Sequence, residues 1–302
     1  AREGRKTVSA GTWRLSGNMK ILRVAKAAQP LFQCEQRLPI HSVYKNTVNL
    51  QSGAQIFALQ AAGIPATPFS VGTDLPGGSL EGLFRGETAV LASPRGICAG
   101  RNTILLPARY ERFDGHYMPG AVPADLIFPA EVLREMLRRL APRDSFFALA
   151  EPSRLAACGR FSGAAEGAVL AMCAEDACTA ADAAQILAEL VGLGQGLTPA
   201  GDDFLVGVLA ALDMARATTL RTALCAALRL QKTNAISAGF LRAAAESDYA
   251  EALLALLRTM DGGAVRESLE ACALRVLQTG HTSGSDTLGG MLWCMDRIER
   301  KK

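Results

Sequence analysis

Residues 129–140 read Pro-Ala-Glu-Val-Leu-Arg-Glu-Met-Leu-Arg-Arg-Leu, and their apolar spacing indicates the architecture of the second half of the chain. Pro129 suits the first turn of a helix, because an N–H at that position has no intrahelical partner to lose. The apolar side chains recur at i, i+3, i+4 and i+7, on one helix face: Leu133, Met136, Leu137 and Leu140. The stretch therefore predicts an amphipathic helix.

The same periodicity continues toward the C-terminus. Further helices are predicted over residues 182–191, 203–217, 220–230, 236–246, 248–259, 265–279 and 286–300. Asp248 and Glu251 have the spacing of a capping box at the start of one of them. Residues 129–302 are thus expected to form an all-helical domain.

The first half of the chain has a different pattern. Short runs rich in β-branched and aromatic residues, separated by Gly and Pro clusters, predict strands near 42–50, 55–59, 88–91, 102–106 and 111–117. In the first run, alternate residues are expected to share one strand face: Ser42, Tyr44, Asn46 and Val48. Residues 76–79 predict a turn and 80–86 the arm of a hairpin. Because the helices follow the strands without alternating, we predict an α+β fold with a β-rich domain at 19–128 and the helical domain at 129–302.

Length and composition narrow the class of protein. A chain of 302 residues suggests two domains, and 49% hydrophobic with 20% charged residues is ample for a packed core. No run approaches the roughly 18 apolar residues that would span a bilayer, so no membrane segment is expected. The net charge is only +3 and the basic residues are scattered, which argues against nucleic acid as a partner.

The cysteines and the first residues indicate the cellular compartment of the protein. The eight cysteines contain no Cys-x-x-Cys pair and lie mostly among alanines and leucines, so we expect reduced, buried thiols in a cytoplasmic protein. Residues 1–18 carry four basic side chains without an apolar core, which does not fit a secretory signal, and Met19 is a candidate start.

A glycine-rich loop precedes the most apolar predicted helix. Residues 192–203 read Gly-Leu-Gly-Gln-Gly-Leu-Thr-Pro-Ala-Gly-Asp-Asp. Glycines bring backbone N–H groups close to a ligand, and a helix N-terminus favours negative charge. A phosphate or carboxylate site is therefore expected in this loop, with Gly194, Gly196, Thr198 and Gly201 as its candidate residues. The alternative is a plain inter-helix turn in which Asp202 caps the helix and Asp203 favours its first turn.

A second loop, Gly280-His-Thr-Ser-Gly-Ser-Asp286, enters the last helix in the same way. Gly207 and Gly290 each lie four residues after an Asp and permit close helix approach. The two helix starts are expected to meet, so that Thr282, Ser283 and Gly284 hold a second anion or a developing oxyanion. Asp202, Asp203 and Asp286 would then need a divalent cation, which makes Mg²⁺ a possible ligand. The alternative is again a Ser or Asp cap.

Two more polar features are candidates for the same site. Residues 232–237 read Lys-Thr-Asn-Ala-Ile-Ser, in which Thr233 or Asn234 suits a helix cap and Asn234 is also a candidate ligand group. Of the three histidines, His281 has the most functional context because it adjoins the second loop. No organic cofactor is predicted.

Four segments together resemble a bacterial family associated with one subunit of oxamate carbamoyltransferase. They are His41-Ser-Val-Tyr with Val48-Asn-Leu, the loop and helix start at 192–207, Thr233-Asn-Ala-Ile-Ser, and 280–286. The resemblance spans about residues 20–298. It implies anaerobic allantoin breakdown, a part of purine metabolism and nitrogen utilisation, in which oxalurate and phosphate give oxamate and carbamoyl phosphate for a carbamate kinase.

The resemblance also implies a transferase component that is active only with two partner subunits, one of them similar to succinyl-CoA synthetases. It identifies no catalytic residue. Read from the loops, His281, Asp203 and Asp286 are the candidate catalytic groups, with His281 placed to protonate the departing oxamate nitrogen. Two alternatives remain: a non-catalytic subunit that only assembles a partner's site, and a metal-dependent hydrolase of an amide or ribosyl bond.

Overall fold

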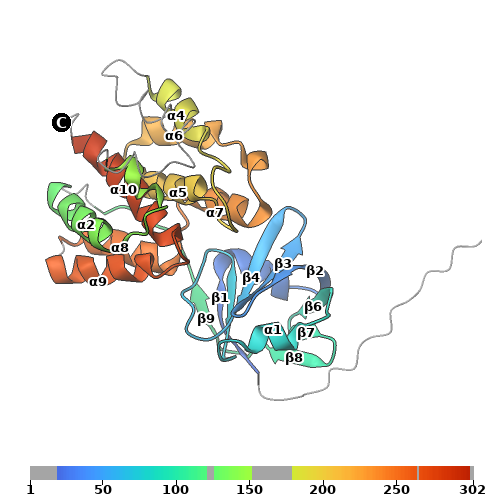
Figure 1. Cartoon of the computed structure of the whole chain (residues 1–302). Coiled ribbons are helices and arrows are strands. Elements are labelled where there is room, and N and C mark those ends of the chain that lie inside the picture. The colour runs from blue at the N-terminus through green and yellow to red at the C-terminus, as the bar shows by residue number, and fades with distance from the viewer. Residues whose placement is uncertain (1–18, 121–125, 152–178, 264, 300–302) are drawn as a thin grey trace, which may run out of the picture. The chain divides into compact units, whose positions relative to one another are not determined.

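The structure is a computed structural model that describes residues 19–120, 126–151, 179–263 and 265–299 (Figure 1). Contacts divide the chain into two compact units, Ala1–Ile64 with Phe69–Phe113, and Pro65–Pro68 with Asp114–Lys302. The sequence places a boundary at residue 128, where the periodicity changes, whereas the contacts group residues 114–120 with the helices. The residues before Met19, and Cys158, Cys173 and Cys178, lie outside the described ranges.

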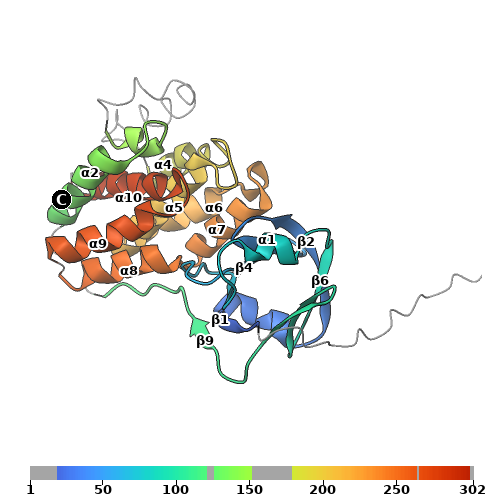
Figure 2. The same ribbon diagram turned by 60° about the horizontal axis from the view of Figure 1, so that its bottom comes forward.

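The first unit is built on one curved, nine-stranded sheet in the order β8-β7-β6-β2-β3-β4-β5-β1-β9 (Figure 2). Its strands are β1 (Ile21–Ala25), β2 (Gln36–Val43), β3 (Thr47–Ser52), β4 (Gln55–Gln60), β5 (Ser70–Thr73), β6 (Ala89–Ser93), β7 (Gly96–Ala99), β8 (Asn102–Leu105) and β9 (Glu111–Phe113). Two short helices, η1 (Lys26–Phe32) and α1 (Ser79–Leu83), complete it. The β4–β5 and β1–β9 pairs are parallel and the other pairs are antiparallel.

Two local predictions in this unit are wrong. Residues 42–50 do not form one strand, because the chain reverses between β2 and β3 and the Tyr44 N–H donates to the Thr47 carbonyl at 2.8 Å. Residues 80–86 are not a hairpin arm, because α1 begins at Ser79. Leu80 and Phe84, four residues apart, are both buried against the unit, and this helical spacing prevails over the short apolar run.

The second unit is helical, which confirms the predicted α+β class with a helical C-terminal part. Its helices are α2 (Ile127–Leu140), η2 (Phe146–Leu149), α4 (Ala180–Ala188), α5 (Ala200–Met214), α6 (Thr218–Ala227), η4 (Leu230–Lys232), α7 (Ala235–Ala245), α8 (Glu251–Asp261), α9 (Arg266–Leu277) and α10 (Ser283–Glu299). Among the described residues, none of the helices has both the length and the apolarity to cross a membrane.

Helices α5 and α10 cross in the middle of this unit, with α8 and α9 on one side (Figure 1). Their backbones touch at two glycines. A Cβ on Gly207 would lie 1.8 Å from the Thr287 carbonyl oxygen, and one on Gly290 would lie 1.9 Å from that of Phe204. No side chain fits at either position, so the expectation of close helix approach is confirmed. The crossing brings the first turns of α5 and α10 together.

The predicted capping box at residues 248–251 is wrong. Helix α8 follows Ala250, which makes no side-chain cap. The Asp248 N–H donates to the Ala243 carbonyl at the end of α7, and the Glu251 carboxylate accepts the Ala66 N–H at 2.8 Å. Both residues thus bond to other segments of the unit instead of to each other, a circumstance that local spacing does not reveal.

Candidate functional site

The glycine-rich loop before α5 depends on three glycines with positive φ. Gly192, Gly194 and Gly196 have φ of +78°, +122° and +104°. A Cβ would lie 2.2 Å from the Lys232 carbonyl oxygen at Gly192 and 2.6 Å from the Ala200 nitrogen at Gly194, but would meet nothing within 4 Å at Gly196. The first two glycines are therefore required by packing as well as by backbone conformation. Gly196 lies exposed at the tip of the loop.

The first turn of α5 uses several of its N–H groups internally. The Gly201 N–H donates to the Leu193 carbonyl at 2.8 Å, and those of Asp202 and Asp203 donate to Pro199 at 2.9 and 3.2 Å. A Cβ on Gly201 would also lie 2.1 Å from the Leu190 carbonyl oxygen, so this glycine serves packing. The other three residues predicted to bind phosphate, Gly194, Gly196 and Thr198, lie in the loop before this helix turn.

Asp202 links α5 to α7 and to the base of the loop. Its side chain is 1% exposed, and its Oδ1 accepts the Gly192 N–H at 2.8 Å. Its Oδ2 accepts the hydroxyls of Thr233 at 2.5 Å and Ser237 at 2.6 Å. Both carboxylate oxygens are therefore bound by protein donors.

Asn234 is the cap of α7, as the sequence suggested. Its Oδ1 accepts the N–H groups of Ile236 at 3.0 Å and Ser237 at 3.1 Å. Its Nδ2 donates to the Leu197 carbonyl at 2.9 Å, which fixes the tip of the glycine-rich loop to the start of α7. A ligand-binding role for Asn234 stays a prediction.

Asp203, one residue further, faces α10 instead. Its side chain is 6% exposed and is hydrogen-bonded to the hydroxyls of Ser283 and Thr198, yet its Oδ2 has no partner among the described residues. Burial raises the pKa of this carboxyl well above its ordinary value. The hydroxyls oppose that rise, while the nearby charge of Asp286 adds to it.

Asp286, in the first turn of α10, is the second buried carboxyl. Its side chain is fully buried, and its Oδ1 accepts the Phe146 N–H from η2 at 2.6 Å. Its Oδ2 has no partner among the described residues. Burial raises the pKa of Asp286 to about 7, although the bonds from Phe146 and the Thr282 hydroxyl act in the opposite direction.

The other residues of the second loop either pack in the interior or lie at the surface. The Gly284 N–H donates to the Thr279 carbonyl at 3.0 Å, and a Cβ there would lie 2.0 Å from the Val276 carbonyl oxygen. Ser283 and Thr282 are half-buried beside the acids, whereas His281 is exposed in the turn before α10. The structure thus brings together Thr198, Asp203, Thr282, Ser283 and Asp286. A catalytic role for His281 stays a prediction.

The predicted Mg²⁺ would have few ligand atoms available here. Across the described ranges, no group of three or more His, Cys, Asp or Glu side chains is arranged to hold a metal ion. Both oxygens of Asp202 accept protein hydrogen bonds. The unpartnered oxygens are one on Asp203 and one on Asp286. Mg²⁺ stays a prediction that rests on these two atoms.

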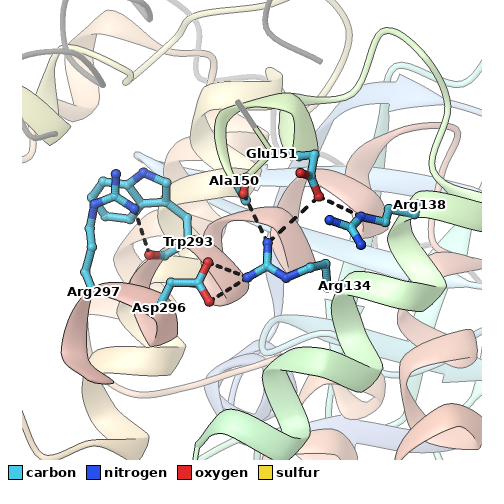
Figure 3. Close-up of polar contacts among 7 residues, drawn as sticks. All are labelled: Arg134, Arg138, Ala150, Glu151, Trp293, Asp296 and Arg297. Atoms are coloured by element: carbon cyan, nitrogen blue, oxygen red, sulfur yellow. Dashed lines mark hydrogen bonds and ion pairs between the residues drawn. The ribbon is translucent and has the colours of Figure 1, made fainter. Parts of the chain in front are cut away.

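Buried aromatic side chains support the two acids. The ring of Phe204, next to Asp203, lies edge-on to Phe146 at 6.5 Å and to Trp293 at 5.8 Å between centroids. The Arg297 guanidinium stacks 3.9 Å from the Trp293 ring centroid (Figure 3). Sequence reasoning missed the contribution of η2, whose Phe146 N–H reaches Asp286, because that contact joins residues 140 positions apart.

A separate ion-pair network fastens α2 to α10 (Figure 3). Arg134 donates to both carboxylate oxygens of Asp296 at 2.6 Å and lies 3.9 Å from Glu151. Arg138 also donates to Glu151, at 2.8 Å. The opposite charges of the four side chains meet one another, so the network is best interpreted as structural.

Comparison with known proteins connects this site to a family. Residues 190–295 match the model of a family described as oxamate carbamoyltransferase subunit AllH. The resemblance seen in the sequence is thereby confirmed over these residues, while the segment at 41–50 lies outside the match. The match covers about a third of the chain, and it includes every predicted site residue from Gly194 to Asp286. No curated protein and no solved structure matches the chain.

Proposed function

We propose that the chain is a subunit of a carbamoyltransferase of the oxamate type, which converts oxalurate and phosphate to oxamate and carbamoyl phosphate. One observation supports this above all. The family match at 190–295 contains both loops and both partly unpaired carboxyls of the candidate site. In this proposal the protein acts in the cytoplasm during anaerobic allantoin catabolism.

The reaction brings two anions to one carbonyl group. A phosphate oxygen bonds to the ureido carbon of oxalurate, the bond from that carbon to the oxamate nitrogen breaks, and the nitrogen takes up a proton. The backbone N–H groups of half-buried Gly194 and Thr198 and of exposed Gly196 are proposed to hold phosphate. The hydroxyls of Thr282 and Ser283 are proposed to donate to the substrate carboxylate or to the developing oxyanion.

The proton has three candidate donors on this chain. His281 is exposed beside the second loop, and an imidazole ring is a common proton donor in catalysis. Asp286 has its pKa raised by burial to about 7, and that of Asp203 is raised as well. Carboxyls that hold a proton near neutral pH can act as general acids.

Other subunits belong to the proposal because the family is named for one subunit of an enzyme. Several N–H groups of the predicted anion site already bind backbone carbonyls, so this chain offers few free donors for two anions. We propose that two partner subunits supply the remaining groups.

The experiment is to measure phosphate-dependent release of oxamate from oxalurate with the purified chain, and then with each partner subunit added. We expect no turnover by the chain alone and turnover by the complete set that stops when this chain is omitted. Robust turnover by the single chain would defeat the subunit proposal. Full activity of the partners without it would remove the chain from the reaction.

A further inference from the structure

Two buried carboxylate oxygens in this molecule have no hydrogen-bond partner among the described residues, and both lie at the crossing of α5 and α10. They are Oδ2 of Asp203 and Oδ2 of Asp286, in residues that are 6% and 0% exposed. Leaving a buried polar group unpaired costs free energy, and a charged group costs more. Such atoms call for a donor that the described protein does not provide.

Donor groups lie directly beside these acceptors. The hydroxyls of Thr198 and Ser283 are hydrogen-bonded to Asp203 and stand 3.5 Å from each other, a distance that leaves their mutual bond weak. Both residues are half-buried, so a ligand can reach them from solvent. Hydroxyls rotate freely to donate to a new acceptor. The cluster thus presents acceptor oxygens and adjustable donors together.

We propose that this cluster binds the amide end of a carbamoyl or ureido group. With the two acids ionised, the N–H₂ donates to the free oxygens of Asp203 and Asp286, and the carbonyl oxygen accepts from the hydroxyls of Thr198 and Ser283. A primary amide is the small group that matches this set, because it donates on one side and accepts on the other. The identification of that amide as part of oxamate rests on the proposed function.

A divalent cation is the rival occupant of the two oxygens, and the geometry disfavours it. The acids sit in the first turns of two helices, whose N-terminal ends carry positive partial charge that opposes a cation. Mg²⁺ also keeps several waters in an octahedral shell. Among the described residues this cluster offers only two unpartnered carboxylate oxygens, which are few ligands for such an ion.

The experiment compares three small acids of nearly equal shape by calorimetric titration of the full chain in a metal chelator. Oxamate carries the amide, pyruvate replaces its NH₂ with a methyl group at equal charge, and oxalate replaces it with a carboxylate oxygen. We expect oxamate to bind at least ten-fold more tightly than pyruvate or oxalate. Equal binding of oxamate and pyruvate, or no binding of any of the three, would overturn the proposal.

Substitutions test whether Asp203 and Asp286 produce the preference for oxamate over pyruvate. Asp203→Asn and Asp286→Asn replace one acceptor oxygen with a donor, so each is expected to abolish the preference for oxamate over pyruvate. Asp213→Asn is the matched control, because this buried acid lies at the far end of α5, where it pairs with Arg221 and Tyr249. It should keep the preference. Circular dichroism of all three verifies folding, and a preference that survives in both site variants would overturn the proposal.

Two further outcomes separate the possible failures. Binding of oxalate that appears only with added Mg²⁺, and disappears in Asp203→Asn, would overturn the amide site in favour of the cation. Carbamoyl transfer by the complete enzyme without any oxamate preference would leave the proposed function standing and defeat the amide site. An Asp203-dependent oxamate preference without transfer activity would support the site and defeat the function.

Discussion

Two adjacent residues of α5, Asp202 and Asp203, face different helices and differ in how completely their carboxylates are hydrogen-bonded. Asp202 faces α7, and both its oxygens accept protein hydrogen bonds. Asp203 faces α10, where it and Asp286 each keep one oxygen without a partner among the described residues. Successive residues of a helix point about 100° apart, because 3.6 residues make one turn. Asp202 therefore stabilises the contact of α5 with α7, whereas Asp203 keeps a carboxylate oxygen available on the side of α10.

The difference comes from what the neighbouring helix offers. The start of α7 supplies two hydroxyls and the loop supplies an N–H, so Asp202 is matched by three donors. The start of α10 supplies the Ser283 hydroxyl but also a second acid, Asp286. Two acids within electrostatic reach cannot satisfy each other unless a proton or a ligand intervenes.

The largest loss of stability is expected at the junction of α5 with α7, where both oxygens of Asp202 are hydrogen-bonded. Asp202→Ala removes the acceptor of three hydrogen bonds and leaves the Gly192 N–H and two hydroxyls unpaired at a buried position. We expect the free energy of unfolding to fall by on the order of 4 kcal/mol. Urea denaturation followed by circular dichroism measures it.

The matched variant is Asp203→Ala on the adjacent position. It removes a buried carboxyl that is only partly paired, so the loss should be smaller than for Asp202→Ala by at least about 2 kcal/mol. Equal losses in the two variants would show that the two junctions do not differ in the way the hydrogen bonds indicate.

The second prediction concerns the pH dependence of the α5–α10 junction. Burial raises the pKa of Asp286 to about 7, so the folded protein retains a proton that the unfolded chain releases near pH 4. The folded state binds more protons between these values, and its stability therefore falls as pH rises from about 4 to 7. The groups that face Asp286 act in the same sense, since Asp144 before η2 and Asp203 on α5 are both acids.

Asp286→Asn isolates this contribution. Relative to the variant, the unmodified chain should lose about 2 kcal/mol of unfolding free energy between pH 5 and pH 8, in a chelator to exclude cations. Unfolding in urea at the two pH values gives the difference. A difference of zero, or a gain with rising pH, would mean that Asp286 ionises freely in the folded chain.

Much of the helical unit follows from the sequence alone. The apolar periodicity at 203–217 and 286–300 predicts helices close to α5 and α10, and the glycines at 207 and 290 predict their contact. These features are local or depend on side-chain size, and both are visible in a single chain. In the β-rich unit, residues 42–50 misled the prediction, because a tight reversal at Tyr44–Asn46 has neither Gly nor Pro to signal it.

The composition of the candidate site was predictable, but its hydrogen bonding was not. Spacing indicates that Asp202 and Asp203 begin a helix, yet it does not tell which acid meets hydroxyls and which meets another acid. That outcome depends on the packing of α7 and α10 around α5, and on the Phe146 N–H of η2, a distant segment. The same holds for Gly201 and Gly284, whose N–H groups looked free in the sequence and donate to carbonyls in the fold.

The smallest expected effect concerns the tip of the glycine-rich loop, on the side of α7. Asn234 caps α7 through Oδ1 and binds the Leu197 carbonyl through Nδ2. Asn234→Asp keeps the capping acceptor and removes the only donor of that side chain, so stability should fall by less than about 1 kcal/mol, because Asp caps helices as well as Asn does. The loop should respond more: amide hydrogen exchange in residues 194–198 should quicken, while exchange in α7 stays unchanged. Asn234→Ala, which loses both functions, should quicken exchange in both segments. If the loop exchanges equally in Asn234→Asp and in the unmodified chain, its conformation is held by the glycines and by Asp202 alone, and the contrast between the two junctions does not extend to the loop tip.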